Sequence, residues 1–293
     1  MATVAEWIEG ARPRTLPTMV SPVLVGCGAT IGAHAFGPWR ALLALIVALA
    51  LGVGVNYAND YSDGIRGTDD ERVGPVRLVA SKLASPEAVR TAALACFAIA
   101  GLAGLTLVSL SGTWWLIAVG AACVLAAWFY TGGKRPYGYA GLGELAVFVF
   151  YGPVAVLGTV ITQDAPVTAP AVVASVGVGM LTSAVLVANN LRDIPTDAAV
   201  GKRTLAVRLG DRDTRRLYAA IVLIPLLFSV VLALLAWPLV LGLLAAPLAI
   251  SVTRTVRSGV GGRDLIPVLA KTGLLLLVWS AGTAVGLALS GWL

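Results

Sequence analysis

Residues 40–63, RALLALIVALALGVGVNYANDYSD, decide the fold class because an apolar run of membrane-spanning length leads directly into amides and carboxylates. The apolar part, 40–58, is long enough to cross a bilayer core, which takes about 20 mostly apolar residues as a helix. The run ends in Asn59, Asp60 and Asp63 rather than in a short turn. This stretch therefore predicts a transmembrane helix with a polar end at the membrane rim.

Similar apolar runs recur along the whole chain. Nine candidate spans are 16–34, 40–58, 88–110, 114–130, 142–162, 169–189, 217–236, 238–254 and 266–290. The boundary between the seventh and eighth, at Trp237–Pro238, is the least sharply marked. The first run follows Arg12 and Arg14 and is too long for a signal-peptide core, so we expect it to be retained. The predicted fold class is all-α, a polytopic membrane bundle of about nine transmembrane helices in one domain, residues 1–293.

The composition supports a membrane protein and excludes several other classes. Hydrophobic residues make up 58% of the chain and charged residues 12%, against about 25% charged in an average soluble domain. This hydrophobicity excludes a disordered chain, and the length with only three cysteines excludes a small disulfide scaffold. The net charge of +6 is expected to serve membrane topology, and no nucleic-acid partner is predicted.

The basic residues fall on alternate linkers. All Lys and Arg residues except Arg40 lie in the N-terminal segment or in the linkers that follow the second, fourth, sixth and eighth spans. Such linkers are cytoplasmic under the positive-inside rule. We therefore expect a multi-pass protein of the cell membrane with a cytoplasmic N-terminus and an external C-terminus. Long polar linkers occur only after the second and sixth spans, which predicts a site that opens to the cytoplasmic side.

Two acidic motifs follow these two spans. On a helix, at 100° per residue, Asn189, Asp193 and Asp197 form one stripe, and Asn56, Asp60 and Asp63 form another. Stacked carboxylates at a bilayer rim repel each other unless a cation lies between them. Mg²⁺ is usually held by one or two carboxylates plus substrate phosphates. Two facing stripes would therefore bind a metal-bridged diphosphate. In the alternative interpretation, these acids are solvated span ends paired with nearby arginines.

Basic residues flank both stripes. Cationic side chains neutralise phosphate oxygens and stabilise a departing diphosphate. The candidates for this role are Arg66, Arg72, Arg77, Lys134, Arg135, Lys202 and Arg203. The alternative is that they only set topology, which we favour for the more distant arginines after the sixth and eighth spans.

A substrate with a diphosphate head and a long apolar tail would fit such a bundle, with its tail among the spans. The corresponding chemistry is ionisation of an allylic diphosphate, followed by attack of an electron-rich acceptor on the carbocation. Aromatic rings can shield such a cation. Trp128, Tyr130, Tyr57 and Phe148 are candidates, although each could instead belong to an interfacial belt.

Taken together, these motifs resemble the UbiA superfamily of membrane aromatic prenyltransferases. The similarity rests on Asn59-x-x-x-Asp63, on Asn189-x-x-x-Asp193-x-x-x-Asp197, on Tyr130-x-x-x-Lys134 and on nine spans. Residues 11–17, 56–63, 74–77 and 134–144 are most similar to members that act on 1,4-dihydroxy-2-naphthoate. The resemblance implies a UbiA-type bundle with Mg²⁺ as cofactor. It also implies polyprenyl diphosphate and 1,4-dihydroxy-2-naphthoate as partners, and prenyl transfer with loss of the ring carboxylate to give demethylmenaquinone.

The resemblance also implies roles for individual residues. Asp63, Asp193 and Asp197 would bind the metal, with the amides Asn56, Asn59, Asn189 and Asn190 at the diphosphate and Tyr130 and Lys134 near it. Gly67 stands where the family has a third Asp, which leaves Asp60 and Asp69 as alternative ligands.

The acceptor's contacts are less defined by sequence. Arg12 or Arg14 is a candidate partner for the acceptor carboxylate. Glu144 is a candidate base or a hydrogen-bond partner of the ring hydroxyls, and a structural pair with Lys134 or Arg135 is equally compatible with the sequence.

Two other functions are compatible with parts of this pattern. Another acceptor, such as 4-hydroxybenzoate, would use the same diphosphate site. A secondary transporter would be expected to carry its charges near the bilayer midplane rather than at span ends.

Overall fold

The computed structural model describes residues 2–67 and 76–291, and these form helices and connecting loops without any β-strand. The elements are α1 (Val4–Gly10), η1 (Pro13–Thr15), α2 (Leu16–Gly32), α3 (Pro38–Arg66), α4 (Pro86–Ser111), α5 (Leu116–Phe129), η2 (Tyr137–Ala140), α6 (Gly143–Val149), the π-helix η3 (Phe150–Val154), α7 (Ala155–Ile161), α8 (Ala169–Ala199), α9 (Leu205–Ala233), η4 (Trp237–Ala245), α10 (Ala246–Arg257), η5 (Gly262–Leu265) and α11 (Ile266–Ser290). The predicted all-α class is confirmed.

Eight helical stretches in the described part of the chain are long and apolar enough to cross a membrane. They are Val4–Gly32, Pro38–Arg66, Pro86–Ser111, Gly143–Ile161, Ala169–Ala199, Leu205–Ala233, Trp237–Arg257 and Gly262–Ser290. A shorter apolar helix, α5, packs beside α3 and α4 in the same bundle. Each of the nine predicted spans therefore corresponds to a helical passage.

Both helices with acidic motifs continue past their apolar parts. Helix α3 runs on to Arg66, and α8 runs on to Ala199 with Pro195 inside it. The acidic stripes therefore lie on continuous helices, as the spacing predicted. The segment after α8 is shorter than expected, because α9 begins at Leu205 and bends at Gly210, whose φ of 75° is left-handed.

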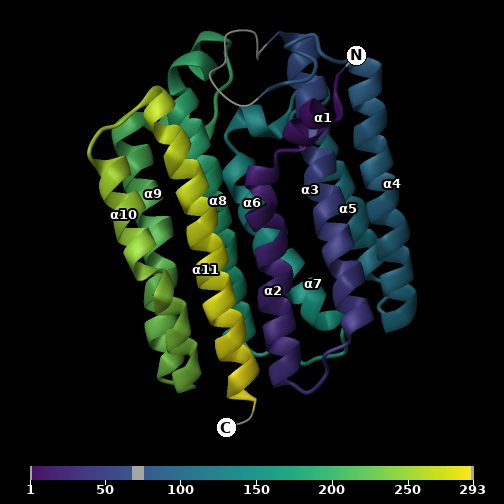
Figure 1. Cartoon of the computed structure of the whole chain (residues 1–293), viewed down its shortest axis with the longest axis vertical. Helices are drawn as coiled ribbons and strands as arrows, with labels where there is room; N and C mark the ends of the chain where they lie inside the picture. The colour runs from purple at the N-terminus through teal and green to yellow at the C-terminus, as the bar shows by residue number, and fades with distance from the viewer. Residues whose placement is uncertain (1, 68–75, 292–293) are drawn as a thin grey trace.

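The helices pack side by side along one common direction (Figure 1). Helix α3 packs against α4, α2 packs against α11, and α8 contacts α9, α11 and α6. One buried apolar cluster, which includes Leu181, Val222 and Trp279, joins α8 to α9 and α11. Another, around Tyr57 and Phe97, joins α3 to α4. At the contact of η3 with α8, a side chain at Gly152 would lie 2.8 Å from the Cα atom of Gly179, so glycines permit this close approach.

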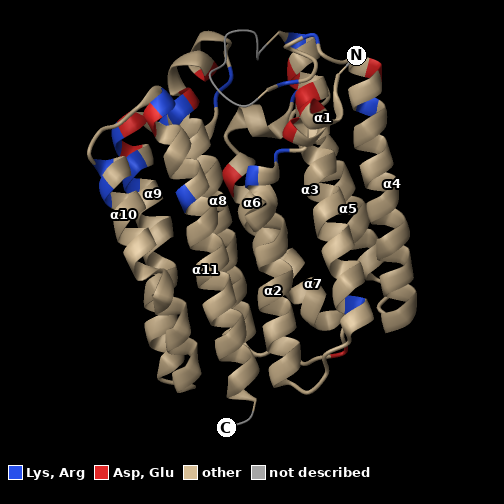
Figure 2. Cartoon of the chain, viewed as in Figure 1, with Lys and Arg blue, Asp and Glu red and all other residues tan. Residues whose placement is uncertain are grey.

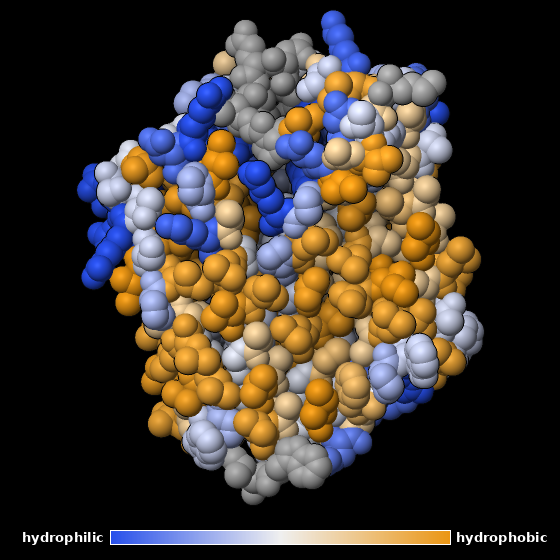
Figure 3. Space-filling view, in the orientation of Figure 1, coloured by the Kyte–Doolittle hydropathy of each residue, from blue (hydrophilic) through white to orange (hydrophobic). Residues whose placement is uncertain are grey.

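Charge is concentrated at one end of the bundle. Figure 2 shows most Lys, Arg, Asp and Glu residues at the end where α1 lies, while α11 ends at the opposite end. The opposite end holds the Arg40–Asp164 ion pair. The face in Figure 3 is broadly hydrophobic between these ends, with hydrophilic residues concentrated at the upper end. Such a surface is what a bundle embedded in lipid presents.

Candidate active site

A cavity of about 270 Å³ lies among α2, α3, α5, α6, η3 and α8. Along α3, its lining passes from Ala48, Leu51 and Val55 to Asn56, Asn59 and Asp63. The 15 helical steps from Ala48 to Asp63 correspond to roughly 22 Å at a rise of 1.5 Å per residue. The cavity is therefore amphipathic, with apolar walls in the bundle and a polar mouth at its charged end.

The polar mouth brings the two sequence motifs into one space. Among the residues predicted for the site, those that line the cavity are Asn56, Asn59, Asp63, Arg77, Tyr130, Asn189, Asn190 and Lys202. Most come from α3, from α8 and from the segments that follow these helices, and Tyr130 comes from the end of α5. Arg12, the candidate partner of the acceptor carboxylate, also lines the cavity. The expectation that both motifs serve one cavity agrees with this geometry.

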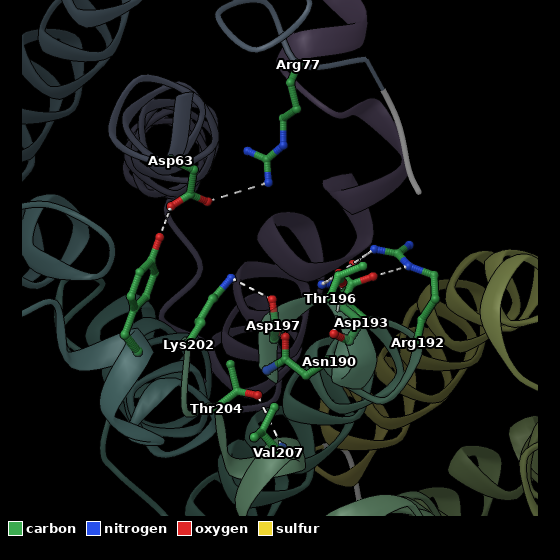
Figure 4. A network of polar contacts seen from close by, with 12 residues as sticks. Asp63, Arg77, Asn190, Arg192, Asp193, Thr196, Asp197, Lys202, Thr204 and Val207 are labelled. Atoms are coloured by element: carbon green, nitrogen blue, oxygen red, sulfur yellow. Dashed lines mark hydrogen bonds and ion pairs between the residues drawn. The ribbon is translucent and has the colours of Figure 1, made fainter. Parts of the chain in front are cut away.

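Asp63 is the carboxylate of the first motif that faces the cavity. Its side chain is buried, and its Oδ1 accepts a hydrogen bond of 2.7 Å from the Tyr139 hydroxyl. Arg77 lies 3.9 Å from Oδ2 as an ion pair (Figure 4). Arg77 is also buried and lines the cavity. A negative and a positive side chain thus stand together at the mouth.

The two asparagines of α3 connect it to neighbouring segments. Asn59 Oδ1 accepts a hydrogen bond of 2.8 Å from Thr131 Oγ1. Asn56 donates to the carbonyl oxygen of Ala11 at 2.9 Å and to Thr15 Oγ1 at 3.2 Å. These bonds fix the chain on both sides of Arg12, which lines the cavity from a left-handed backbone conformation with φ 58°. Arg14, the other predicted partner of an acceptor carboxylate, is exposed.

The second motif forms a network on α8 (Figure 4). The Asp193 carboxylate accepts two hydrogen bonds from the Arg192 guanidinium, at 2.6 and 2.7 Å, and this pair is buried. Arg192 also donates to Asn189 Oδ1 at 2.9 Å. Asp197 pairs with Lys202 Nζ at 3.5 Å. Of these five residues, Asn189 and Lys202 line the cavity, and they connect it to the carboxylates behind them.

Sequence reasoning did not assign Tyr139 to the site. It donates to Asp63, and its ring centroid lies 5.1 Å from Lys202 Nζ and 5.6 Å from Arg66 Cζ. It thus connects the first motif to the lysine that pairs with the second. The one sequence feature that could have indicated Tyr139 is its position in segment 134–144, which contributed to the family resemblance.

Asp60 does not enter the cavity, contrary to its predicted role as a metal ligand and catalytic residue. Its two carboxylate oxygens accept the backbone N–H groups of Leu78, at 2.7 Å, and Val79, at 3.1 Å. Because the segment that returns after α3 occupies both oxygens, Asp60 holds the segment that also carries Arg77. Asp69, the alternative ligand, and Arg72 lie outside the described residues.

The other predicted basic residues surround the mouth rather than line it. Arg66 donates to the carbonyl oxygens of Thr131 and Gly133 and so holds the turn after α5. Lys134, Arg135 and Arg203 are exposed. The structure therefore does not bring these four side chains to the cavity wall.

The predicted aromatic residues separate into two groups. Tyr130 lines the cavity, but Tyr57 donates to the Trp7 carbonyl oxygen in the α3–α4 cluster, and Trp128 packs against Tyr61. Phe148 lies against Gly179 of α8.

Three further aromatic side chains, missed by the sequence reasoning, line the cavity: Tyr137, Phe150 and Tyr151. Burial, reinforced by Tyr151, raises the pKa of Tyr137 to about 12. This phenol therefore stays protonated at neutral pH and donates to the Ala126 carbonyl oxygen at 2.8 Å.

Glu144 contacts α8 rather than the basic pair at 134–135. Its Oε1 accepts a hydrogen bond of 2.8 Å from Asn190 Nδ2, and its backbone carbonyl accepts one from Ser183. The predicted alternative of a structural pair with Lys134 or Arg135 does not agree with these contacts.

The donor set fits a hard divalent cation whose coordination a substrate completes. No group of three or more His, Cys, Asp or Glu side chains converges in the described part of the chain. The oxygen donors that line the mouth are instead one carboxylate, Asp63, and the amides of Asn59 and Asn189, while Asp193 and Asp197 lie behind Asn189 and Lys202. Mg²⁺ is typically held by one or two carboxylates together with phosphate oxygens, so this arrangement suits a cation that arrives with a diphosphate.

The fold and the cavity define a class of protein: a bundle of apolar helices with an amphipathic cavity that opens at its charged end. The sequence model of the UbiA prenyltransferase family matches residues 19–264. The chain belongs to this family. Together with its apolar helices, this makes it a multi-pass membrane protein.

Two curated relatives of this chain have the same name. A 1,4-dihydroxy-2-naphthoate octaprenyltransferase of Mycobacterium tuberculosis is 59% identical over 288 residues, which covers 98% of each chain. The Escherichia coli protein of the same name is 37% identical over 223 residues, covering 74% of this chain and 72% of that protein. Among solved structures, a UbiA homologue from Archaeoglobus fulgidus bound to DMAPP and Mg²⁺ superposes with a TM-score of 0.65. The superposition covers 96% of this chain and 99% of the homologue's chain, at 16% sequence identity. It therefore supports the fold.

Proposed function

We propose that this chain transfers a polyprenyl group from polyprenyl diphosphate to 1,4-dihydroxy-2-naphthoate, with loss of the ring carboxylate as CO₂, to give demethylmenaquinol, the reduced form of demethylmenaquinone. The observation that carries the proposal is the amphipathic cavity, whose polar mouth joins Asp63 of α3 to Asn189 and Lys202 next to the second motif. The relatives that cover nearly the whole chain bear the name of this activity.

The residues at the mouth would hold the diphosphate. Arg77 and Lys202 both line the cavity and can each contact phosphate oxygens. Asp63, Asp193 and Asp197, with the amides of Asn59 and Asn189, would hold Mg²⁺, which when bound supplies further positive charge to the diphosphate. In the reaction, the bond between the first prenyl carbon and the bridging oxygen breaks, and its electron pair leaves with the diphosphate.

The rest of the cavity would guide the prenyl group. Aliphatic side chains such as Met19, Leu51 and Val55 exclude water from the tail. Tyr130, Phe150 and Tyr151 line the cavity, and their rings would stabilise positive charge on the allylic carbon. The acceptor ring then supplies the electron pair for the new carbon–carbon bond, and departure of the carboxylate as CO₂ restores the aromatic ring.

The test is an acceptor panel with one polyprenyl diphosphate and membranes that contain the protein. We expect a prenylated naphthoquinol with CO₂ release from carboxyl-labelled 1,4-dihydroxy-2-naphthoate, and little product from 4-hydroxybenzoate. Product that retains the carboxylate, or a preference for 4-hydroxybenzoate, would assign the chain to another acceptor.

We also propose that the charged end of the bundle faces the cytoplasm. The concentration of Lys and Arg at this end supports this orientation under the positive-inside rule. In a variant without Cys27, Cys96 and Cys123, a membrane-impermeant thiol reagent added to intact cells should label Asp164→Cys and spare Ser258→Cys, an exposed position between α10 and η5. The reverse pattern would invert the topology.

A further inference from the structure

Glu144 is a buried carboxylate at the start of α6 with one oxygen left unpaired. Its side chain is 7% exposed. Its Oε1 accepts the hydrogen bond from Asn190, whereas its Oε2 is buried and accepts none from any described residue. Leaving a buried acceptor unpaired costs stability, and more for a charged group. Glu144 itself does not line the cavity, so this carboxylate acts on a ligand through its partner Asn190, which does.

The same contact fixes the orientation of the Asn190 amide. The Asn190 Nδ2 donates to Glu144 Oε1, so the amide turns its NH₂ group toward Glu144. Its Oδ1 is then the atom left to meet a ligand, because it accepts no hydrogen bond from the described residues and Asn190 lines the cavity. The Asn190 amide therefore presents an oxygen acceptor to the cavity.

Such an oxygen would bind a hydrogen-bond donor or a hard cation. Loss of a cation ligand would change KM for the diphosphate, whereas loss of a donor site would change KM for the acceptor. A diphosphate presents oxygens of its own with negative charge, and the cationic side chains for it, Arg77 and Lys202, are also at the mouth. Each ring hydroxyl of a dihydroxynaphthoate is a donor. Resting on the function proposed above, we infer that Glu144 and Asn190 form the site that binds a ring hydroxyl of the aromatic acceptor.

The surroundings of the pair suit an aromatic ring. The neighbouring Gly143 lies against Tyr130, because a side chain at this glycine would be 3.2 Å from the Tyr130 hydroxyl and 3.5 Å from Leu186 Cδ2. Tyr130 and Leu186 both line the cavity. A ring between them would meet an aromatic face, an aliphatic side chain and the polar pair. Asn190 touches the acceptor in this arrangement, and Glu144 is a positioning residue that acts in part through it.

The experiment compares the two substrates separately. Asn190→Ala and Glu144→Ala should each raise KM for 1,4-dihydroxy-2-naphthoate by about tenfold, the equivalent of one hydrogen bond to a charged or oriented group. KM for polyprenyl diphosphate should change by less than about twofold on the same scale. Ser183→Ala is the matched control, because it removes the bond to the Glu144 backbone without altering the carboxylate, and should leave both constants unchanged. A rise in KM for the diphosphate alone, or no change in either constant, would overturn the inference.

Analogues of the acceptor that lack one ring hydroxyl show which hydroxyl contacts Asn190. 1-Hydroxy-2-naphthoate and 4-hydroxy-2-naphthoate each lack one donor of the acceptor. For one of them, the loss in kcat/KM seen with the wild type should disappear in Asn190→Ala, since the bond is already absent. Equal losses in the wild type and the variant, for both analogues, would contradict a hydroxyl contact.

Exchanging the amide and the carboxylate between positions 144 and 190 gives a rescue test. If the pair binds the acceptor, the exchange should restore the KM for the acceptor, which a purely structural role would not predict. Asn190→Asp alone places two carboxylates together and should impair acceptor binding. Adding Glu144→Gln restores the bond with its direction reversed, so the double variant should recover most of the acceptor KM. If the double variant is no better than Asn190→Asp, the inference fails. Should the wild type prefer 4-hydroxybenzoate, the proposed acceptor is wrong, but the same comparisons made with that phenol still decide the role of the pair.

Discussion

The Tyr139 hydroxyl donates a hydrogen bond of 2.7 Å to Asp63, while Lys202 Nζ lies 5.1 Å from the centroid of the Tyr139 ring. Lys202 in turn pairs with Asp197 at 3.5 Å. One tyrosine from the short helix η2 thus connects the carboxylate of α3 with the charged end of α8. Residues more than 130 positions apart are held at one cavity mouth through these contacts.

Removal of the Tyr139 hydroxyl should weaken this connection without removing the ring. We expect Tyr139→Phe to raise KM for polyprenyl diphosphate by about 3- to 10-fold, because Asp63 loses one charge-assisted hydrogen bond that orients it. Steady-state kinetics with a varied diphosphate concentration measures this change. Tyr218→Phe is a suitable control, because it also removes a buried tyrosine hydrogen bond, to Thr272, and neither of these residues lines the cavity. An equal effect of both variants would mean that Tyr139 acts only through stability.

Asp63 should be required for turnover. Asp63→Asn preserves the size of the side chain but removes the negative charge that faces Arg77 and the proposed cation. We expect turnover to fall at least about 100-fold, in the range seen for loss of an electrostatic group at a reacting centre. The thermal midpoint in detergent should change by only a few degrees. Retention of near-normal turnover would remove Asp63 from the proposed ligand set.

The neighbouring Asp60 should give the opposite pattern. Asp60→Ala leaves the N–H groups of Leu78 and Val79 without their carboxylate acceptor, in a segment where Leu78 is fully buried. We expect the free energy of unfolding to fall by roughly 2–4 kcal/mol. Thermal unfolding in detergent would show this loss as a lower midpoint. In the fraction that remains folded, the Mg²⁺ concentration for half-maximal rate should be unchanged; a large shift would restore Asp60 as a ligand.

The fold was predictable because its main determinant is local. Each crossing is encoded by its own apolar run, and even the short α5 corresponds to the predicted span 114–130. The exact ends of the helices were harder to predict. The predicted seventh span began at residue 217, whereas α9 begins at Leu205, because a polar, amphipathic stretch precedes its apolar part. Hydropathy marks the lipid-facing part of a helix and not the helical turns that extend beyond it.

The site was predictable where helical spacing alone decides which side chains share a face. Spacing placed Asn56, Asp60 and Asp63 on one stripe, yet two of these line the cavity and Asp60 bonds a segment 18 residues away. Helical periodicity cannot distinguish these outcomes, because the choice depends on which chain segment packs beside the helix. Tyr139 was missed for a related reason: its role depends on a loop whose return is fixed by the bond from the Arg203 N–H to the Tyr139 carbonyl oxygen.

Lys202 should contribute to diphosphate binding. It lines the cavity, its backbone N–H donates to the Asp197 carbonyl oxygen at 2.8 Å, and its ammonium group is therefore held at the mouth. We expect Lys202→Ala to raise KM for polyprenyl diphosphate about 10-fold or more and to leave acceptor KM nearly unchanged. Lys271→Ala removes an exposed lysine from the same end of the bundle and serves as the control. Equal effects of the two variants would indicate a general electrostatic influence rather than a direct contact.

Metal removal tests the donor set as a whole. Since no three acidic, His or Cys side chains converge in the described residues, the protein alone should hold the cation weakly, and the diphosphate should complete its coordination. EDTA should therefore abolish turnover, and added Mg²⁺ should restore it. Isothermal titration of the purified protein should detect Mg²⁺ binding only in the presence of an unreactive diphosphate analogue. Tight Mg²⁺ binding without the analogue would show that protein ligands suffice. Turnover that survives chelation would exclude the metal from the reaction, and diphosphate binding would then depend on Arg77 and Lys202.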